Sequence, residues 1–350
     1  MEAAVKTSSK NFDAIDLCKL VAALFVVCIH TDPLESVSES ANFMVADCLS
    51  RFAVPFFFVS SSFFFFRGGV DGQKLKHYEK RMCILYAIWY VIAFPVTFMR
   101  KYSVWFSDYS LPVAIWKCLR GLLFASSFRG SWFLSGSMFC AAVIYFLSKK
   151  MSTKQLMVVT GIPYLFCVLC STYGNLLDWI GLEQVYDTFL FFFPHPYTSI
   201  ITGLQYFAIG KYFAEHEAQV VGGNTKKYAV LTALTMAALC MEAILAKRNG
   251  LVESTDCMLM IIPNVWCLMK LVLSLRIHLP HMREIRASGV IVFFIHFGIL
   301  YMFQQMDQCL GIHVDSVTRY LLILLISFSF AAFVLRMEKR KHCHWMRYLH

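Results

Sequence analysis

Long apolar blocks constrain this chain more than any other feature of its sequence. Hydrophobic residues make up 58% of the 350 residues and charged residues only 15%, whereas an average soluble domain carries about 25% charged residues. The apolar residues are grouped into blocks, and a helix that crosses a bilayer needs about 20 such residues. Because unpaired strand edges are not tolerated in lipid, these blocks should be helices. We therefore expect an all-α, polytopic membrane helical bundle.

The block pattern predicts about ten transmembrane helices in a single domain over residues 1–350. The predicted spans lie near 15–31, 52–67, 83–99, 132–148, 155–171, 198–213, 228–246, 257–275, 289–306 and 318–335. The stretch 111–128 is apolar, but Lys117 and Arg120 interrupt it, which favours an interfacial or re-entrant helix. The first block lacks a small-residue cleavage site, so we expect a permanent span. Residues 337–350 form a short basic tail.

The distribution of basic residues predicts the orientation. The net charge of +10 resides in short loops between the blocks, which indicates membrane topology and not nucleic-acid binding. With both termini in the cytoplasm, 21 Lys and Arg residues fall on the inner side and nine on the outer side. The loop 100–131 is the main exception, because it carries five basic residues on the outer side. A re-entrant helix there, or a span count that is off by two, would explain it.

The 13 cysteines do not indicate a metal site or a functional disulfide. Most lie inside apolar blocks, where a free thiol behaves as a small hydrophobe. No C-x-x-C pair is accompanied by histidines at zinc-binding spacing. We expect no metal and no permanently bound cofactor.

Ionisable residues inside spans are the main functional candidates, and the first span contains three. Lys19 and His30 are 11 residues apart, so they share one helix face and are separated by about 16 Å along the axis. Asp16 lies about 40° from the same line. This stripe would suit a long ligand whose anionic head is held by Lys19 at the inner side and whose reactive end reaches His30. Alternatively, Lys19 extends to the inner interface and His30 caps the outer one.

Other ionisable residues leave two or three interpretations each. Arg51, at the outer end of the second span, would pair with an acid, hold a substrate anion or anchor the interface. Glu242 falls in the same outer leaflet as His30, and would orient an imidazole, bind a sugar hydroxyl or join two helices. His296 lies mid-span and is either a satisfied bundle histidine or a substrate contact. Arg81 follows an inner loop, where it serves topology or ligand binding.

Five segments together resemble the bacterial membrane acyltransferase-3 family. They are A-I-D-L-C-K-L-V-A-A-L-F-V-V-C-I-H-T (14–31), S-R-F-A-V-P-F-F-F-V-S (50–60), Y-E-K-R-M-C-I-L-Y-A-I-W (78–89), G-S-W-F-L (130–134) and A-S-G-V-I-V-F-F-I-H (287–296). Three positions depart from the family pattern: Lys19 replaces a usual arginine, Ser61 a usual glycine and Ile84 a frequent second basic residue. The form with Lys19 and Glu242 is similar to the branch that includes the membrane domains of vancomycin-type serine racemases, although no racemase domain follows in this sequence.

The resemblance implies an O-acetyltransferase-like enzyme of the bacterial inner membrane, with acetyl-CoA or another acyl-CoA as donor substrate. Its acceptor would be a hydroxyl of a cell-envelope carbohydrate or of a lipid-linked molecule. Membrane lipids would surround the enzyme. The oligomeric state stays open, with a homodimer as one option. The implied roles are catalysis by His30, Glu242 and Arg51, donor binding by Lys19, Arg81 and Asp16, and substrate contacts by Trp132, His296 and Ser60.

Two other functions compete with acyl transfer. A transporter of a lipid or sugar also needs many helices and intramembrane charges, but it would favour inverted repeats, which the sequence does not show. A non-catalytic membrane partner would not need the stripe that joins Lys19 to His30.

Overall fold

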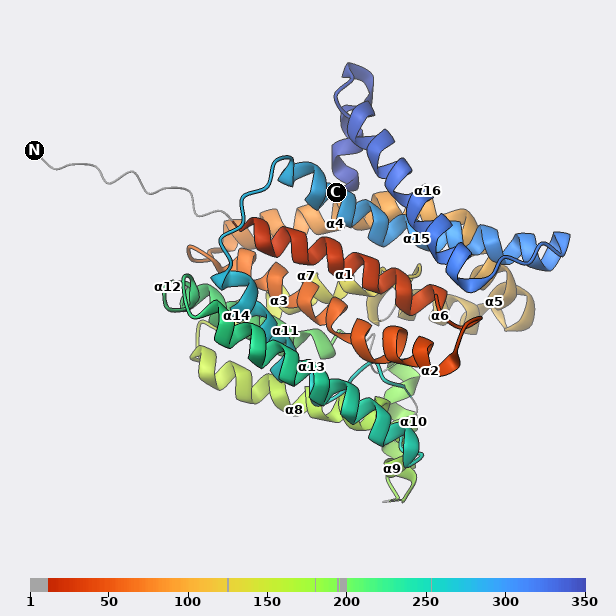
Figure 1. The fold of residues 1–350 in the computed structure, drawn as a ribbon. Coiled ribbons are helices and arrows are strands. Elements are labelled where there is room, and N and C mark those ends of the chain that lie inside the picture. The colour runs from red at the N-terminus through yellow and green to blue at the C-terminus, as the bar shows by residue number, and fades with distance from the viewer. Residues whose placement is uncertain (1–11, 125, 180, 194, 196–199, 253) are drawn as a thin grey trace, which may run out of the picture.

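The computed structural model describes residues 12–124, 126–179, 181–193, 195, 200–252 and 254–350, and every regular element within these ranges is helical (Figure 1). In the first half, the α-helices are α1 (Asp13–Thr31), α2 (Glu39–Asn42), α3 (Ala53–Phe66), α4 (Gly72–Thr97), α5 (Ser103–Asp108), α6 (Leu111–Phe124), α7 (Trp132–Leu147) and α8 (Thr153–Ser171). In the second half they are α9 (Gly174–Trp179), α10 (Glu183–Phe192), α11 (Thr202–Glu215), α12 (Glu217–Val220), α13 (Thr225–Arg248), α14 (Ile261–Ser274), α15 (Met282–Leu310) and α16 (Ser316–Met337). Short π- or 3₁₀-helical segments are η1 (Phe43–Cys48), η2 (Leu49–Phe52), η3 (Phe98–Tyr102) and η5 (Lys341–Leu349).

The predicted all-α membrane bundle is confirmed. Each of the ten predicted spans overlaps a helix; residues 257–260 precede α14, residues 200 and 201 precede α11, and residues 198 and 199 lie outside the described residues. Seven helical stretches are long and apolar enough to cross a membrane. The remaining three predicted spans correspond to the shorter helices α7, α11 and α14, of 16, 14 and 14 residues.

Side-chain caps determine where several helices begin. The carboxylate of Asp71 accepts a hydrogen bond from the Lys74 backbone N–H at 2.7 Å and starts α4. Asp315 accepts from the Thr318 backbone N–H at 3.0 Å and starts α16. Hydrogen bonds from the side chain and the backbone N–H of Thr318 lower the pKa of the Asp315 carboxyl, because a carboxylate accepts hydrogen bonds better than the neutral acid does. Such caps satisfy backbone donors that the helix itself leaves unpaired.

The centre of the bundle is the contact between α3 and α11, which approach each other closely because Gly210 has no side chain. A Cβ atom at Gly210 would lie 2.5 Å from the Ser62 Cβ atom, and the Ser62 hydroxyl donates to the Phe207 carbonyl at 2.5 Å. α1 packs along α15 in the same way, with Gly289 facing the backbone of Leu20. By contrast, α4 leaves much of its apolar surface exposed, as expected of a helix facing lipid.

Figure 1 shows the two ends of the bundle clearly. The beginning of α1 and the short α12 lie at one end, which the charge pattern predicts to be cytoplasmic, whereas α2, α5 and α6 lie at the other. The stretch predicted as an interfacial or re-entrant helix contains α6, which is not among the seven long apolar helices. The C-terminal segment η5 folds back onto α4: Leu349 is buried, and its carbonyl accepts a hydrogen bond from Trp89 Nε1 at 3.1 Å.

Candidate functional site

A cavity of about 540 Å³ opens at the predicted cytoplasmic end and is lined by α1, α3, α4, α7 and α15. It contains all three residues that the resemblance assigned to the donor: Asp16, Lys19 and Arg81. Asp16 and Lys19 share the inner end of α1, whereas Arg81 comes from α4, so the bundle brings together charges that are about 60 residues apart in sequence.

The two cations of this set are available to a ligand. Among the described residues, Lys19 and Arg81 form no hydrogen bond or ion pair, and the Lys19 ammonium lies 4.8 Å from the Phe64 ring centroid. Asp16 is buried, and one of its carboxylate oxygens lies 3.5 Å from Arg286 Nη1. The other oxygen has no hydrogen-bond partner within the described chain. A net positive cavity of this kind attracts phosphate groups.

Sequence reasoning missed several residues at the mouth of the cavity. They are Lys74, His77, Arg283, Arg286 and His350. The arginines had a visible signal, because they stand in the basic run that opens the span before His296, but loop charges of this kind are normally explained by topology. His350 gave no signal. It reaches the cavity because η5 folds back, and its Nε2 atom lies 2.9 Å from the buried Glu338 carboxylate, which also pairs with Arg283 at 2.9 Å.

Aromatic side chains form the deep end of the cavity. Phe57, Phe133 and Phe293 line it and pack against one another, with ring centroids 5.5–6.0 Å apart. Ser61 also lines the wall. The cavity therefore changes from charged at the mouth to apolar inside, which suits a ligand with an anionic head and an uncharged arm.

His30 and His296 form a pair just beyond this aromatic end. Their rings stack with centroids 5.7 Å apart, and the Phe297 ring contacts both, at 4.7 Å from His30 and 3.9 Å from His296. The Phe293 ring of the cavity wall also lies beside His296, at 6.5 Å between centroids. The fold thus brings into contact two histidines that are 266 positions apart in the sequence. The sequence had indicated each of them as a separate candidate.

The hydrogen bonding of His296 leaves one nitrogen available for chemistry. Its Nδ1 atom lies 3.1 Å from the Val292 carbonyl, and because a carbonyl oxygen only accepts, Nδ1 carries the proton. Nε2 is then an unprotonated acceptor, and it is buried without a partner among the described residues. A buried polar atom without a partner is costly, so this nitrogen is a candidate to contact a substrate or to share a proton with His30.

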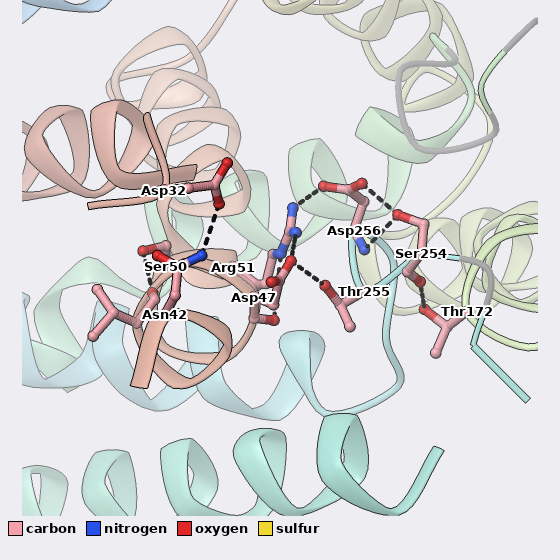
Figure 2. Close-up of polar contacts among 10 residues, drawn as sticks. Asp32, Asn42, Asp47, Ser50, Arg51, Thr172, Ser254, Thr255 and Asp256 are labelled. Atoms are coloured by element: carbon pink, nitrogen blue, oxygen red, sulfur yellow. Dashed lines mark hydrogen bonds and ion pairs between the residues drawn. The ribbon is translucent and has the colours of Figure 1, made fainter. Parts of the chain in front are cut away.

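Arg51 pairs with acids, which was one of the three possibilities that the sequence left open. Figure 2 shows its guanidinium between the carboxylates of Asp47, at 2.5 Å, and Asp256. Thr255 donates to the same Asp47 oxygen at 3.2 Å. The side chain is buried, so this network fixes the loop before α14 to the start of α3. Its positive charge still acts on His30 electrostatically, as does that of Arg129.

Glu242 has its hydrogen-bond partners elsewhere. Its carboxylate accepts from the backbone N–H groups of Leu259 and Met260, at 2.8 and 2.7 Å, and from the Tyr173 hydroxyl at 2.8 Å. These contacts join α13 to the beginning of α14, as the helix-joining alternative predicted.

Trp132 and Ser60 lie next to the cavity wall without lining the cavity. The Trp132 ring packs against Phe58 at 5.5 Å, while its neighbours Phe133 and Leu134 line the cavity. Ser60 is fully buried and donates to the Phe57 carbonyl at 3.1 Å. Across the described ranges, no group of three or more His, Cys, Asp or Glu side chains is arranged to hold a metal ion.

Comparison with known proteins gives a family for this architecture. A family model described as "Acyltransferase domain" matches residues 12–336. Two curated relatives from Enterococcus faecalis, each named amino-acid racemase, are 25% identical over 273 residues and 21% identical over 337 residues. These alignments cover 77% and 94% of this chain but only 37% and 46% of the relatives, so the chain spans less than half of their length. No solved structure matches the chain.

Proposed function

Because the chain belongs to this acyltransferase family, we propose that it moves an acyl group, acetyl in the simplest case, from acyl-CoA to a hydroxyl of a cell-envelope carbohydrate or lipid-linked acceptor. We place it in the inner membrane of a bacterial cell. The observation that carries the proposal is the cavity, whose charged mouth and aromatic interior lead from Lys19 and Arg81 to the edge of the His30–His296 pair.

The donor would bind with its phosphates at the mouth. Lys19 and Arg81 offer charges with no carboxylate partner within the described chain, and Arg286 adds a third that is already partly neutralised by Asp16. The guanidinium of arginine matches phosphate oxygens with paired donors. Ile84, which stands where a second basic residue is frequent in the family, is absent from the cavity lining. We propose that the arginines of α15 supply the charge that Ile84 lacks.

The acyl end would extend along the aromatic wall toward the histidines. In the transfer step, the acceptor oxygen bonds to the thioester carbonyl carbon and the carbon–sulfur bond breaks. His30 takes the proton of the attacking hydroxyl and passes it to the leaving thiolate, so that charge is conserved. The oxyanion that forms in between would be stabilised by the nearby positive charge of Arg129, because the charge of Arg51 is already balanced by Asp47 and Asp256.

We do not include amino-acid racemisation, the activity named for the curated relatives, in this proposal. Amino-acid racemase is the name of chains whose matched part is less than half of their length, whereas the family model covers nearly the whole of this chain. We therefore base the proposed reaction on the family domain and on the cavity.

Acyl-CoA turnover by the purified protein tests the proposed function. We expect wild-type protein in lipid nanodiscs to hydrolyse labelled acetyl-CoA, with water taking the place of the acceptor hydroxyl and free CoA released, and His30→Ala to reduce this rate by about 10²–10⁴-fold, the range for loss of a general base. His313→Ala is the matched control, because His313 is an exposed loop histidine and its loss should leave turnover unchanged. Full activity in a folded His30→Ala protein would refute the assignment.

A further inference from the structure

The outer end of the bundle carries basic residues where the charge pattern of membrane proteins predicts few. Arg100 and Lys101 lie on η3, and Arg129 lies in the turn before α7. Lys101 Nζ donates to the Ser126 carbonyl at 3.3 Å, which holds η3 against this turn. The charges of both arginines act on Lys101. Three of the basic residues by which the loop 100–131 departs from the positive-inside rule therefore lie close together in space.

Arg100 and Lys101 are not neutralised by carboxylates of the described residues, whereas three other outer cations are. Arg51 has two carboxylate partners, Arg319 lies 3.9 Å from Glu35 and Lys247 lies 3.8 Å from Glu39. Within the residues that the structure describes, Arg100 and Lys101 have no carboxylate within ion-pair distance. Holding like charges together without a counter-charge is unfavourable. A site of this kind is stabilised when an anion binds.

One face of α15 connects these cations to the histidine pair. Phe293, Phe297 and Tyr301 follow each other at intervals of four residues and so lie on one side of the helix. The Phe293 ring lines the donor cavity, the Phe297 ring contacts both histidines, and the Tyr301 ring lies 5.4 Å from the Arg100 guanidinium carbon. The Arg129 guanidinium lies 6.0 Å from the Phe297 ring.

The turn that presents Arg129 is fitted closely to Phe297. Gly130 has a φ of 85°, and a Cβ atom at this position would lie 2.6 Å from the Phe297 ring. Only glycine adopts this conformation readily and leaves room for the ring. The turn therefore holds Arg129 next to the ring that separates it from His30 and His296. The Nε2 atom of His296, which has no hydrogen-bond partner among the described residues, is an independent sign that a ligand atom belongs at this place.

We propose that Arg100, Lys101 and Arg129 bind a phosphate group of the acceptor, so that the acceptor is a hydroxyl compound bearing a phosphate mono- or diester near the hydroxyl that is acylated. This inference rests on the proposed function and specifies its substrate class. Arginine and lysine donate charge-assisted hydrogen bonds to phosphate oxygens. The phosphate would be held at the outer face while the neighbouring hydroxyl reaches the histidine pair, with the donor arriving from the opposite side.

Two model acceptors that differ only by a phosphate, glycerol 3-phosphate and glycerol, test the proposal. We expect wild-type protein in phosphatidylcholine nanodiscs to bind glycerol 3-phosphate at least about tenfold more tightly than glycerol, because charge-assisted hydrogen bonds are the stronger ones. Arg100→Gln/Lys101→Gln should reduce this ratio to about one. Lys247→Gln/Arg248→Gln, which removes two cations from the outer end of α13, should leave the ratio unchanged. Thermal stabilisation by each compound measures binding without any need for turnover.

Three results would overturn the proposal. Equal affinity of the wild-type protein for the two compounds would show that Arg100, Lys101 and Arg129 do not recognise phosphate. A ratio that persists in Arg100→Gln/Lys101→Gln would place phosphate binding elsewhere. A phosphate preference that is lost in phosphatidylglycerol nanodiscs would identify a lipid headgroup as the occupant. The proposed function fails in a different way, through absence of CoA release, which leaves the binding measurement informative.

Discussion

Glu242 shows how a half-buried carboxylate can join helices at a place where the sequence suggests catalysis. Two of its three hydrogen bonds come from backbone N–H groups at the beginning of α14, where the helix dipole favours negative charge. The third comes from Tyr173. Burial of Tyr173, and this bond to Glu242, raise the pKa of the Tyr173 hydroxyl, so the hydroxyl remains a donor at physiological pH. Glu242 is thus held by the ends of two helices.

At this residue we predict an effect on stability and not on the chemical step. Glu242→Gln should lower the unfolding free energy by about 1–3 kcal/mol, because one oxygen is replaced by an amide donor that faces a backbone N–H group. The shift appears as a lower unfolding temperature in detergent, with CoA release per folded molecule close to that of the wild type. An unchanged unfolding temperature together with lost turnover would instead return Glu242 to the reacting centre.

The local sequence could indicate which residues are chemically unusual but not which of them meet. Lys19 and His30 share one helix, so their common face follows from helix geometry alone. The pairing of His30 with His296 and that of Arg51 with Asp256 depend on how distant helices are placed. For Arg51 this decided between the three possibilities, because Asp256, unlike the local partner Asp47, meets its guanidinium only in the folded bundle.

At the scale of elements, the contact between α3 and α11 fixes the position of the cavity wall. Gly203 and Gly210 lie two turns apart on α11, and both face α3. A Cβ atom at either position would clash with α3. Close backbone approach through small residues is a common way for helices to associate in membranes. Since α3 also carries Phe57 and Ser61 of the cavity, a shift of α11 would move the cavity wall.

We therefore predict that Gly210→Leu prevents normal folding. A Cβ atom there would lie 2.3 Å from the Val59 carbonyl oxygen, and a leucine adds further bulk at a contact between two backbones. Size-exclusion chromatography in detergent should show aggregated or strongly diminished protein. Gly161→Ala in α8 is the control, because its nearest neighbour would be a side-chain oxygen at 3.8 Å. A monodisperse Gly210→Leu protein with a wild-type unfolding temperature would contradict this account of the core.

The elements themselves were largely predictable, because hydropathy is a local property. All ten predicted spans overlap helices, including α7, α11 and α14, which are too short for a length criterion. That the segment η5 packs against α4 and reaches the cavity could not be predicted. Its sequence is a basic tail, and only the complete fold shows Leu349 buried beside Trp89 and His350 at the cavity.

At the scale of the whole molecule, the charges form two separate groups with the histidine pair between them. Lys19, Arg81 and Arg286 line the cavity, whereas Arg100 and Arg129 contact Tyr301 and Phe297 further along α15. An aromatic wall connects the first group with the histidines. Under the proposed function, the donor and the acceptor would approach from opposite faces of the membrane.

The most direct test of this account is the side from which acyl-CoA is used. Acyl-CoA is charged and does not cross a bilayer, so it can be offered to either face in sealed inside-out or right-side-out vesicles from cells that express the protein. We predict that labelled acetyl-CoA releases CoA only in inside-out vesicles, where the end carrying Lys19 and Arg81 faces the medium, and that Lys19→Ala/Arg81→Ala abolishes this release. Equal release in right-side-out vesicles, or release that persists in the double variant, would contradict the central claim that the inner cavity is the donor site.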